Sequence, residues 1–287
     1  MNRISVMADW FHRGVIGGLV AAKAVGAGAV QLNVGEARGS VKDIWTPSFR
    51  EEVRNALTDH ALNVSAMCGD LGGHGFQIAE DNAWRIEETR SMFSLARALG
   101  TDIITSHIGV VPEDDNHPRR AIMVEAMQSL GRLAADEGCK IAIETGPEHP
   151  LVLRRFLRDV GSAAIGVNYD PANLIMVLKD VDIVEGVRTL AGSIFHTHVK
   201  DGRQLQYAGP EVVYGFFAEG GIGDMRMEEY ILETPLGDGD VDFDGWLAAL
   251  CEIGYKGYFT IEREVGSDPT ADIKKAVDFL RGHGLHE

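Results

Sequence analysis

Residues 135–146 read ADEGCKIAIETG and contain the pattern that decides the fold. A helix is expected to end at Gly138, because glycine accepts the left-handed backbone conformation that closes a helix. The apolar run after it is typical of a short buried strand. The same helix–glycine–strand unit recurs in KAVGAGAVQLNVGE (23–36), RALGTDIITSHIG (97–109), RDVGSAAIGVNYD (158–170) and EIGYKGYFTIERE (252–264).

Extending this pattern along the chain predicts eight strands that alternate with helices. The strands are expected at residues 3–8, 29–34, 62–68, 102–107, 140–145, 164–170, 193–199 and 257–262. The helices are expected at residues 15–26, 48–60, 81–99, 117–137, 150–159, 180–190, 242–253 and 270–282. Such alternation predicts an α/β fold with a parallel sheet. Eight units in 287 residues match a (β/α)8 TIM barrel that forms a single domain over residues 1–287.

A doubly wound sheet is the rival architecture. It usually has fewer strands and a glycine-rich phosphate loop after the first strand, whereas this chain continues with MADWFHRG (7–14). The segment 201–240, after the seventh strand, is longer than an ordinary loop of this kind. In a barrel this extended loop would lie over the active face, as a lid or as a contact between subunits, which leaves a homo-oligomer open.

The composition excludes several classes of partner. The chain has 27 basic and 43 acidic residues, a formal net charge of −16, which disfavours nucleic acid and anionic membranes. It has no apolar stretch long enough for a membrane span. Charged residues interrupt its first apolar segment, so we expect no signal peptide. Three scattered cysteines indicate neither a disulfide framework nor a zinc ribbon, and a cytoplasmic location is expected.

Four consecutive predicted strands end in residues that bind metal ions. These residues are Glu144, Asp170, His198 and Glu262. In barrels the chemistry lies at the carboxyl ends of the strands. A single acidic residue at a strand end is more often a helix cap or an ion-pair partner, but four in register are hard to attribute to chance. His196 points the same way as His198, and we choose His198 because it is nearer the open end.

Three carboxylates in one pocket would repel one another, and one would have to hold a proton. A divalent cation removes that cost. Mainly oxygen ligands with one imidazole favour Mn²⁺, Mg²⁺ or Co²⁺, and Zn²⁺ accepts the same set. The sequence therefore predicts a divalent metal ion at these four residues.

The chain resembles the xylose isomerase-like TIM-barrel superfamily over all eight units, and the resemblance is most specific from about residue 140 to the end. The pieces that carry the resemblance are IAIETG (141–146), GVNYDPANL (166–174), HTHVKDG (196–202), LGDGDVDFDGWLAALCEIGYKG (236–257) and TIERE (260–264). The superfamily includes sugar phosphate isomerases and epimerases, tagatose and psicose 3-epimerases, hydroxypyruvate isomerases, inosose dehydratases and repair endonucleases. The resemblance implies that Glu144, Asp170, His198 and Glu262 are the metal ligands. It also implies that Glu144 and Glu262 are the catalytic proton-transfer pair.

The activity that this implies is a metal-dependent sugar isomerase or epimerase. A metal that bridges two substrate oxygens acidifies the neighbouring C–H and stabilises the enediolate that forms. A lyase that dehydrates a keto-inositol or cleaves a 3-oxo-glycoside starts with the same step and remains open. A non-catalytic sugar-binding barrel predicts a missing ligand, and none of the four is missing. The repair nucleases need a further histidine, and residues 201–225 contain none.

Five further residues are expected to bind a small sugar or cyclitol substrate. These are His107, Asn173, His196, Lys200 and Arg203. Asn173 stands where many relatives have a substrate-contacting histidine, and Arg203 resembles a substrate-contacting arginine of the epimerases. Glu36 would either hydrogen-bond the sugar or cap a helix. The glycine-rich turn CGDLGGHGF (68–76) lacks a phosphate-loop ending, so an unphosphorylated substrate is preferred.

Overall fold

The computed structural model describes residues 3–34 and 45–286, and its main element is a closed barrel of eight parallel strands. The strands are β1 (Arg3–Met7), β2 (Ala29–Asn33), β3 (Asn63–Cys68), β4 (Ile103–Ser106), β5 (Lys140–Glu144), β6 (Ile165–Tyr169), β7 (Ile194–Val199) and β10 (Tyr258–Ile261). Each lies within one of the eight predicted ranges. The ring closes in the order β1–β10–β7–β6–β5–β4–β3–β2, which confirms the TIM barrel.

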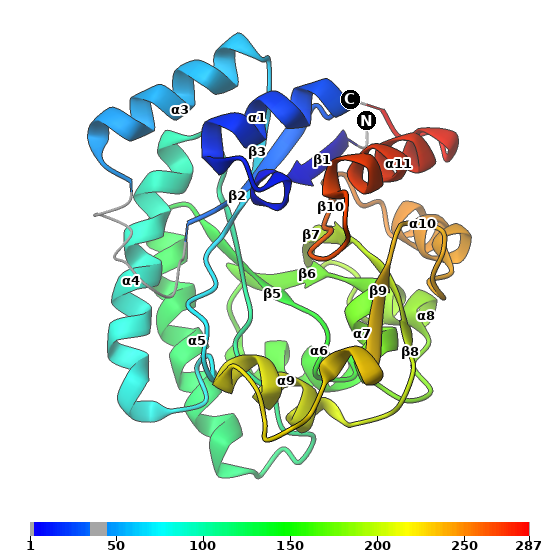
Figure 1. The fold of residues 1–287 in the computed structure, drawn as a ribbon. Helices are drawn as coiled ribbons and strands as arrows, with labels where there is room; N and C mark the ends of the chain where they lie inside the picture. The colour runs from blue at the N-terminus through cyan, green and yellow to red at the C-terminus, as the bar shows by residue number, and fades with distance from the viewer. Residues whose placement is uncertain (1–2, 35–44, 287) are drawn as a thin grey trace.

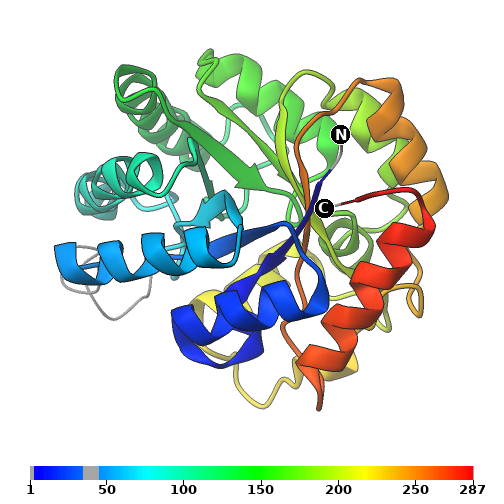
Figure 2. The ribbon, with the colours of Figure 1, turned by 90° about the horizontal axis from the view of Figure 1, so that it is seen from above.

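Helices surround the strands, as the view along the barrel shows (Figure 2). The outer helices are α1 (Gly14–Val25), α3 (Pro47–Asp59), α4 (Ala79–Ala98), α5 (Pro118–Asp136), α6 (Pro150–Val160), α8 (Ile183–Thr189), α10 (Phe243–Glu252) and α11 (Pro269–Gly282). Each overlaps a predicted helix. Their apolar faces pack against the outside of the strands in one hydrophobic cluster. No helix among the described residues combines the length and the apolar character that a membrane crossing requires.

A short helix that the sequence did not indicate, α7 (Pro171–Val177), follows β6 directly. It has seven residues, which is too few to display a helical stripe of apolar side chains. The Asp170 side chain caps it by accepting a hydrogen bond from the backbone N–H of Asn173 at 2.9 Å. Pro171 in the first turn has the backbone angle that a helix needs. The cap fixes the carboxylate of Asp170 at the end of β6.

The segment 201–240 is structured. It contains β8 (Asp201–Gln204), α9 (Pro210–Glu219), the 3₁₀ turn η2 (Met227–Glu229) and β9 (Ile231–Thr234). β8 and β9 pair antiparallel in a sheet of two strands. Figure 1 shows α9 on the end of the molecule opposite the chain termini. The segment thus begins where β7 ends, on the face to which the strand ends of the barrel point.

Asp201 holds the end of this segment against the barrel. Its buried carboxylate accepts hydrogen bonds from the backbone N–H groups of Gly202, Gly237, Gly239 and Val241 at 2.8–3.2 Å. Hydrogen bonds to an ionised group are stronger than those between neutral groups. The glycines in PLGDGD (235–240) let the backbone wrap this closely, since a Cβ at Gly239 would lie 2.1 Å from the carboxylate.

We predict that Asp201→Asn lowers the free energy of unfolding by about 2–4 kcal/mol. The amide cannot accept hydrogen bonds through its nitrogen, so two backbone N–H groups lose their acceptor. Chemical denaturation followed by circular dichroism measures the change. Asp238→Asn, an exposed substitution in the same turn, is the control and should change stability by less than about 0.5 kcal/mol. Equal stability of the two variants would contradict the role assigned to Asp201.

The barrel interior is more polar than the outer layer. Ser5, Gln31, Ser65, His196 and Thr260 are all buried inside it. They are joined by hydrogen bonds, which include Ser5 Oγ to Ser65 Oγ at 2.8 Å and Thr260 Oγ1 to His196 Nε2 at 2.9 Å. Burial of polar groups is tolerated because they satisfy one another. This network of polar groups extends from the middle of β1 and β3 through Gln31 to His198 near the end of β7.

Candidate functional site

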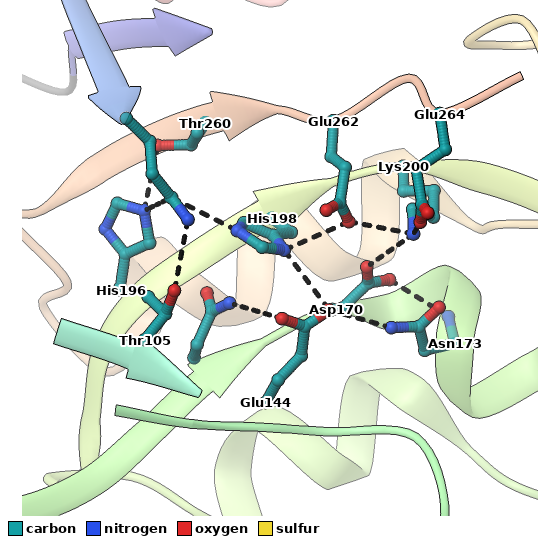
Figure 3. Close-up of polar contacts among 12 residues, drawn as sticks. Thr105, Glu144, Asp170, Asn173, His196, His198, Lys200, Thr260, Glu262 and Glu264 are labelled. Atoms are coloured by element: carbon teal, nitrogen blue, oxygen red, sulfur yellow. Dashed lines mark hydrogen bonds and ion pairs between the residues drawn. The ribbon is translucent and has the colours of Figure 1, made fainter. Parts of the chain in front are cut away.

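The fold brings Glu144, Asp170, His198 and Glu262 together. One ligand atom of each lies within 4.8 Å of the others, and all four residues are buried. They come from the ends of β5, β6, β7 and β10, which are neighbours in the barrel order. Figure 3 shows the imidazole of His198 between the carboxylates of Glu144 and Glu262. The convergence follows from the parallel pairing of these consecutive barrel strands, in which Thr260 of β10 lies beside His198 of β7.

The imidazole of His198 faces two carboxylates with one nitrogen and an amide with the other. Nδ1 lies 3.3 Å from Glu144 Oε1 and 3.1 Å from Glu262 Oε2. Nε2 lies 3.1 Å from Gln31 Oε1. A neutral imidazole that donates from Nε2 presents a lone pair at Nδ1. That lone pair would repel both carboxylates unless a cation, either a proton or a metal ion, lies between them.

The charges of this cluster shift the pKa values of its members in different directions. Burial lowers the pKa of His198, but the carboxylates of Glu262 and Glu144 raise it well above its usual value. Burial raises the pKa of Glu262, but His198 and Lys200 more than offset this and lower it. For Asp170, burial raises the pKa, and the charges of Glu144 and Glu262 add to the effect. The cluster thus contains more carboxylates than protonation of its own side chains can neutralise without a large cost in free energy.

Lys200 compensates part of this negative charge. Its side chain is buried, and Nζ lies 2.8 Å from Glu262 Oε2 and 3.9 Å from Asp170 Oδ2. Glu264 forms a further ion pair with the same ammonium group. Burial lowers the pKa of Lys200, but these carboxylates raise it well above its usual value. Three carboxylates, one ammonium and one divalent ion would give a neutral group.

The donor set fits a divalent ion. Asp170 Oδ2, His198 Nδ1 and Glu262 Oε2 are buried atoms that find no hydrogen-bond partner among the described residues. A metal bound at about 2.0–2.3 Å holds its ligand atoms roughly 3–4.5 Å apart, close to the separation in this cluster. Three oxygens and one imidazole nitrogen suit Mn²⁺, Mg²⁺ or Co²⁺ and are also accepted by Zn²⁺.

Asn173 and His107 both lie beside Glu144. Asn173 Nδ2 donates to Glu144 Oε1 at 3.0 Å, from the first turn of α7. The side chain of His107 is one-third exposed, and its Nε2 lies 3.8 Å from the same oxygen. These two predicted substrate residues therefore border the cluster on the side of β5 and β4.

Lys200, described above, lies in the cluster, whereas His196 and Arg203 do not contact the carboxylates of the cluster. His196 is fully buried below His198, where its Nε2 contacts Gln31 and Thr260. Burial and the nearby His198 lower its pKa well below the usual value. Arg203 is half-exposed on β8, and its guanidinium contacts Asp240 and the backbone of Asp238. Glu36 lies outside the described residues.

A buried carboxyl group that the sequence did not single out, that of Glu148, lies in the loop after β5. The residue is 4% exposed. Burial raises its pKa to about 8, and the backbone of Val111 and the charge of His107 offset only part of the effect. Neither oxygen makes a well-aligned hydrogen bond within the described ranges. The sequence GPEHP (146–150) is typical of a polar loop. The burial of Glu148 follows only from how this loop packs in the folded protein.

We predict that Glu148→Gln stabilises the protein increasingly as the pH rises. A carboxyl group with a raised pKa keeps its full contribution to stability below its unfolded pKa and loses it as the pH rises through the folded pKa. The difference from the parent protein should therefore grow between pH 5 and pH 8, by roughly 2–5 kcal/mol. Thermal unfolding at both pH values measures it. Glu113→Gln, an exposed change in a neighbouring loop, is the control, and a pH-independent difference for Glu148→Gln would refute the prediction.

Comparison with known proteins identifies relatives along almost the whole chain. The L-ribulose-5-phosphate 3-epimerase UlaE of Shigella flexneri is 22% identical over 91% of this chain and 86% of its own length. A xylose isomerase domain protein from Planctomyces limnophilus has a similar solved structure, with a TM-score of 0.74 and 27% identity over 92% of this chain and 90% of that one.

Two further solved structures share the fold at lower identity. The probable 3-DHS dehydratase AsbF from Bacillus anthracis has a TM-score of 0.75 and 18% identity and covers 97% of this chain and 98% of its own. The IOLI protein, solved with a binding zinc atom, has a TM-score of 0.72 and 15% identity over 98% of this chain and 97% of its own. The family model described as xylose isomerase-like TIM barrel matches residues 19–283. The chain therefore belongs to the xylose isomerase-like TIM barrel family.

Proposed function

We propose that this protein is a divalent-metal-dependent isomerase or epimerase of a sugar or cyclitol. The observation that carries the proposal is the convergence of four buried ligand atoms within 4.8 Å, with Nδ1 of His198 at 3.1–3.3 Å from two carboxylate oxygens. The name of UlaE, an epimerase of a sugar phosphate, supports the same class of reaction. Because residues 3–34 and 45–286 form no dedicated phosphate site, we prefer an unphosphorylated substrate.

A divalent ion at this site would supply Lewis acidity, which makes the C–H bond next to a carbonyl of the bound substrate more acidic. Glu144 and Glu262 then carry the proton transfers. They approach His198 from different sides of the barrel, on β5 and β10. One glutamate, as the carboxylate, removes the proton from one face of the substrate, and the other, as the carboxylic acid, returns its proton to the opposite face, which inverts the carbon and exchanges the protonation states of the two residues. Return to the adjacent carbon gives an isomer instead.

The neighbours of the two glutamates set their orientation and basicity. Asn173 donates to Glu144, and the ammonium group of Lys200 forms an ion pair with Glu262 at 2.8 Å. A hydrogen bond to a carboxylate fixes its rotamer and favours its charged form. We propose that His107, Asn173 and Lys200 also bind substrate hydroxyl groups beside the metal ion. The roles of Arg203 and His196 in substrate binding remain predictions from the sequence.

For the ion, we propose Mn²⁺, Mg²⁺ or Co²⁺, because three of the four ligand atoms are carboxylate oxygens. Zn²⁺ is the alternative, and the IOLI protein with its zinc atom supports it. Elemental analysis of the purified protein by mass spectrometry distinguishes these ions.

A second candidate function is a lyase of the same architecture. The dehydratase name of AsbF supports it. Elimination starts with the same proton removal and then needs a group that protonates the leaving hydroxyl group. The mass of the product separates the two functions, because elimination changes the formula and isomerisation does not.

We predict that Glu144→Gln and Glu262→Gln each lower the exchange of substrate C–H with solvent deuterium by about 10²–10⁴-fold, the usual effect of losing a general base. Proton NMR with Mg²⁺, over a panel of ketoses, inososes and 3-oxo-glucosides, measures the exchange. Asp102→Asn, a half-exposed carboxylate at the amino-terminal end of β4, is the control. Exchange at the parental rate in Glu262→Gln would remove that residue from the mechanism.

We predict that Asp170→Asn mainly lowers metal occupancy. The substitution removes one negative charge from the cluster but keeps an oxygen that can cap α7. Metal content by mass spectrometry should fall at least tenfold after dialysis against a weak chelator, while the far-ultraviolet circular dichroism stays unchanged. We base the size of this fall on other metal sites, where mutation of a residue that only hydrogen-bonds a ligand lowers metal affinity 10–100-fold. Parental occupancy would show that Asp170 is not a ligand.

A further inference from the structure

Gln31 on β2 is a buried amide that touches two histidines at once. Its Oε1 lies 2.8 Å from His196 Nε2 and 3.1 Å from His198 Nε2. Its Nε2 donates to Thr105 Oγ1 on β4 at 3.1 Å. The side chain is 0% exposed, and it crosses the barrel interior below the cluster of carboxylates. No sequence pattern singled out this residue.

His196 determines which way the amide of Gln31 points. Its Nδ1 is buried and meets no partner in the described part of the chain, whereas its Nε2 lies near two oxygens, Gln31 Oε1 and Thr260 Oγ1. A neutral imidazole carries one hydrogen, and a buried N–H without an acceptor is costly. The hydrogen therefore belongs on Nε2. Gln31 must then present its oxygen, and not its NH₂ group, toward the histidines.

The same oxygen sets the tautomer of His198. A carbonyl oxygen only accepts hydrogen bonds, so the Nε2 of His198 at 3.1 Å must be its N–H nitrogen. In the neutral ring, the form that binds a metal ion, the lone pair then lies on Nδ1, which faces Glu144 and Glu262. Histidines that bind metal ions usually donate their other N–H to such an acceptor, which holds the ring and raises the basicity of the ligating nitrogen.

We propose that Gln31 is a positioning residue that presets His198 to bind the metal ion through Nδ1, with His196 holding Gln31 in the required orientation. The inference rests on the metal site of the proposed function. Through Gln31 the polar interior of the barrel controls the ligand geometry at its open end. Without the amide oxygen, the ring of His198 could take either tautomer and would spend part of its time with a hydrogen on Nδ1.

The test compares Zn²⁺ binding to the metal-free full chain by competition with a chromogenic chelator. Gln31→Met keeps the length of the side chain but removes the acceptor, so its affinity for Zn²⁺ should fall 10–100-fold. Gln31→Glu restores an acceptor oxygen and should bind Zn²⁺ at least as tightly as the parent. Ser65→Ala is the matched control, because Ser65 belongs to the same interior network but its hydrogen bonds are to Ser5, Thr260 and backbone oxygen.

A second measurement reports the tautomer directly. In the Zn²⁺-loaded parent protein with ¹⁵N-labelled histidine, long-range ¹H–¹⁵N NMR should show His198 with metal on Nδ1 and hydrogen on Nε2. In Gln31→Met the Nε2 hydrogen should exchange faster with solvent. Coordination through Nε2 in the parent overturns the inference even if Gln31→Met fails to fold.

The outcomes separate this inference from the proposed function. If the parent binds no divalent ion, the proposed metal site is wrong. If the parent binds Zn²⁺ and Gln31→Met binds it as tightly as Ser65→Ala does, the metal site stands and the role of Gln31 is refuted. Loss of affinity in Gln31→Met together with its recovery in Gln31→Glu supports the inference, because a general loosening of the barrel would not be repaired by an acidic residue.

Discussion

The structure depends on how three buried carboxylates are kept together around one imidazole. Glu144, Asp170 and Glu262 meet His198 inside a closed barrel, where their repulsion is screened by protein and not by water. Lys200 offsets one charge through its contact with Glu262. The remaining excess is what a divalent ion would neutralise. The pKa values of these neighbours move in opposite directions because burial and the other carboxylates raise that of Asp170, whereas His198 and Lys200 lower that of Glu262.

The surroundings of the cluster are built to hold it in place. Asp170 caps α7 while it faces the site, and Asn173 from the same turn donates to Glu144. On the other side, Arg263 joins the end of β10 to Glu233 on β9 and to Asp272 on α11. Asp201 accepts hydrogen bonds from the backbone at the end of the segment 201–240 and so holds that end against the barrel. The loops on the carboxyl face are thus tied to the strands that carry the ligands.

Much of the site could be predicted from the sequence because strands in a barrel end at a common level. The glycine after each helix marked where a strand begins, and the residues at strand ends then pointed to Glu144, Asp170, His198 and Glu262. Glu148 and Gln31 could not be found in this way. Glu148 lies in a loop whose burial depends on packing against neighbouring loops, and Gln31 is one polar residue in the apolar run AVQLN (29–33).

The sequence by itself determined the order of strands and helices, the barrel and the four side chains at its open end, because these follow from local periodicity, glycine positions and chain length. Only the tertiary structure decided how near those side chains lie and which nitrogen of His198 faces them. It also decided that 201–240 forms a paired segment with its own helix, and that a chain of polar groups fills the barrel. These features arise from contacts between residues far apart in the sequence, such as Gln31 and His198, which no local pattern records.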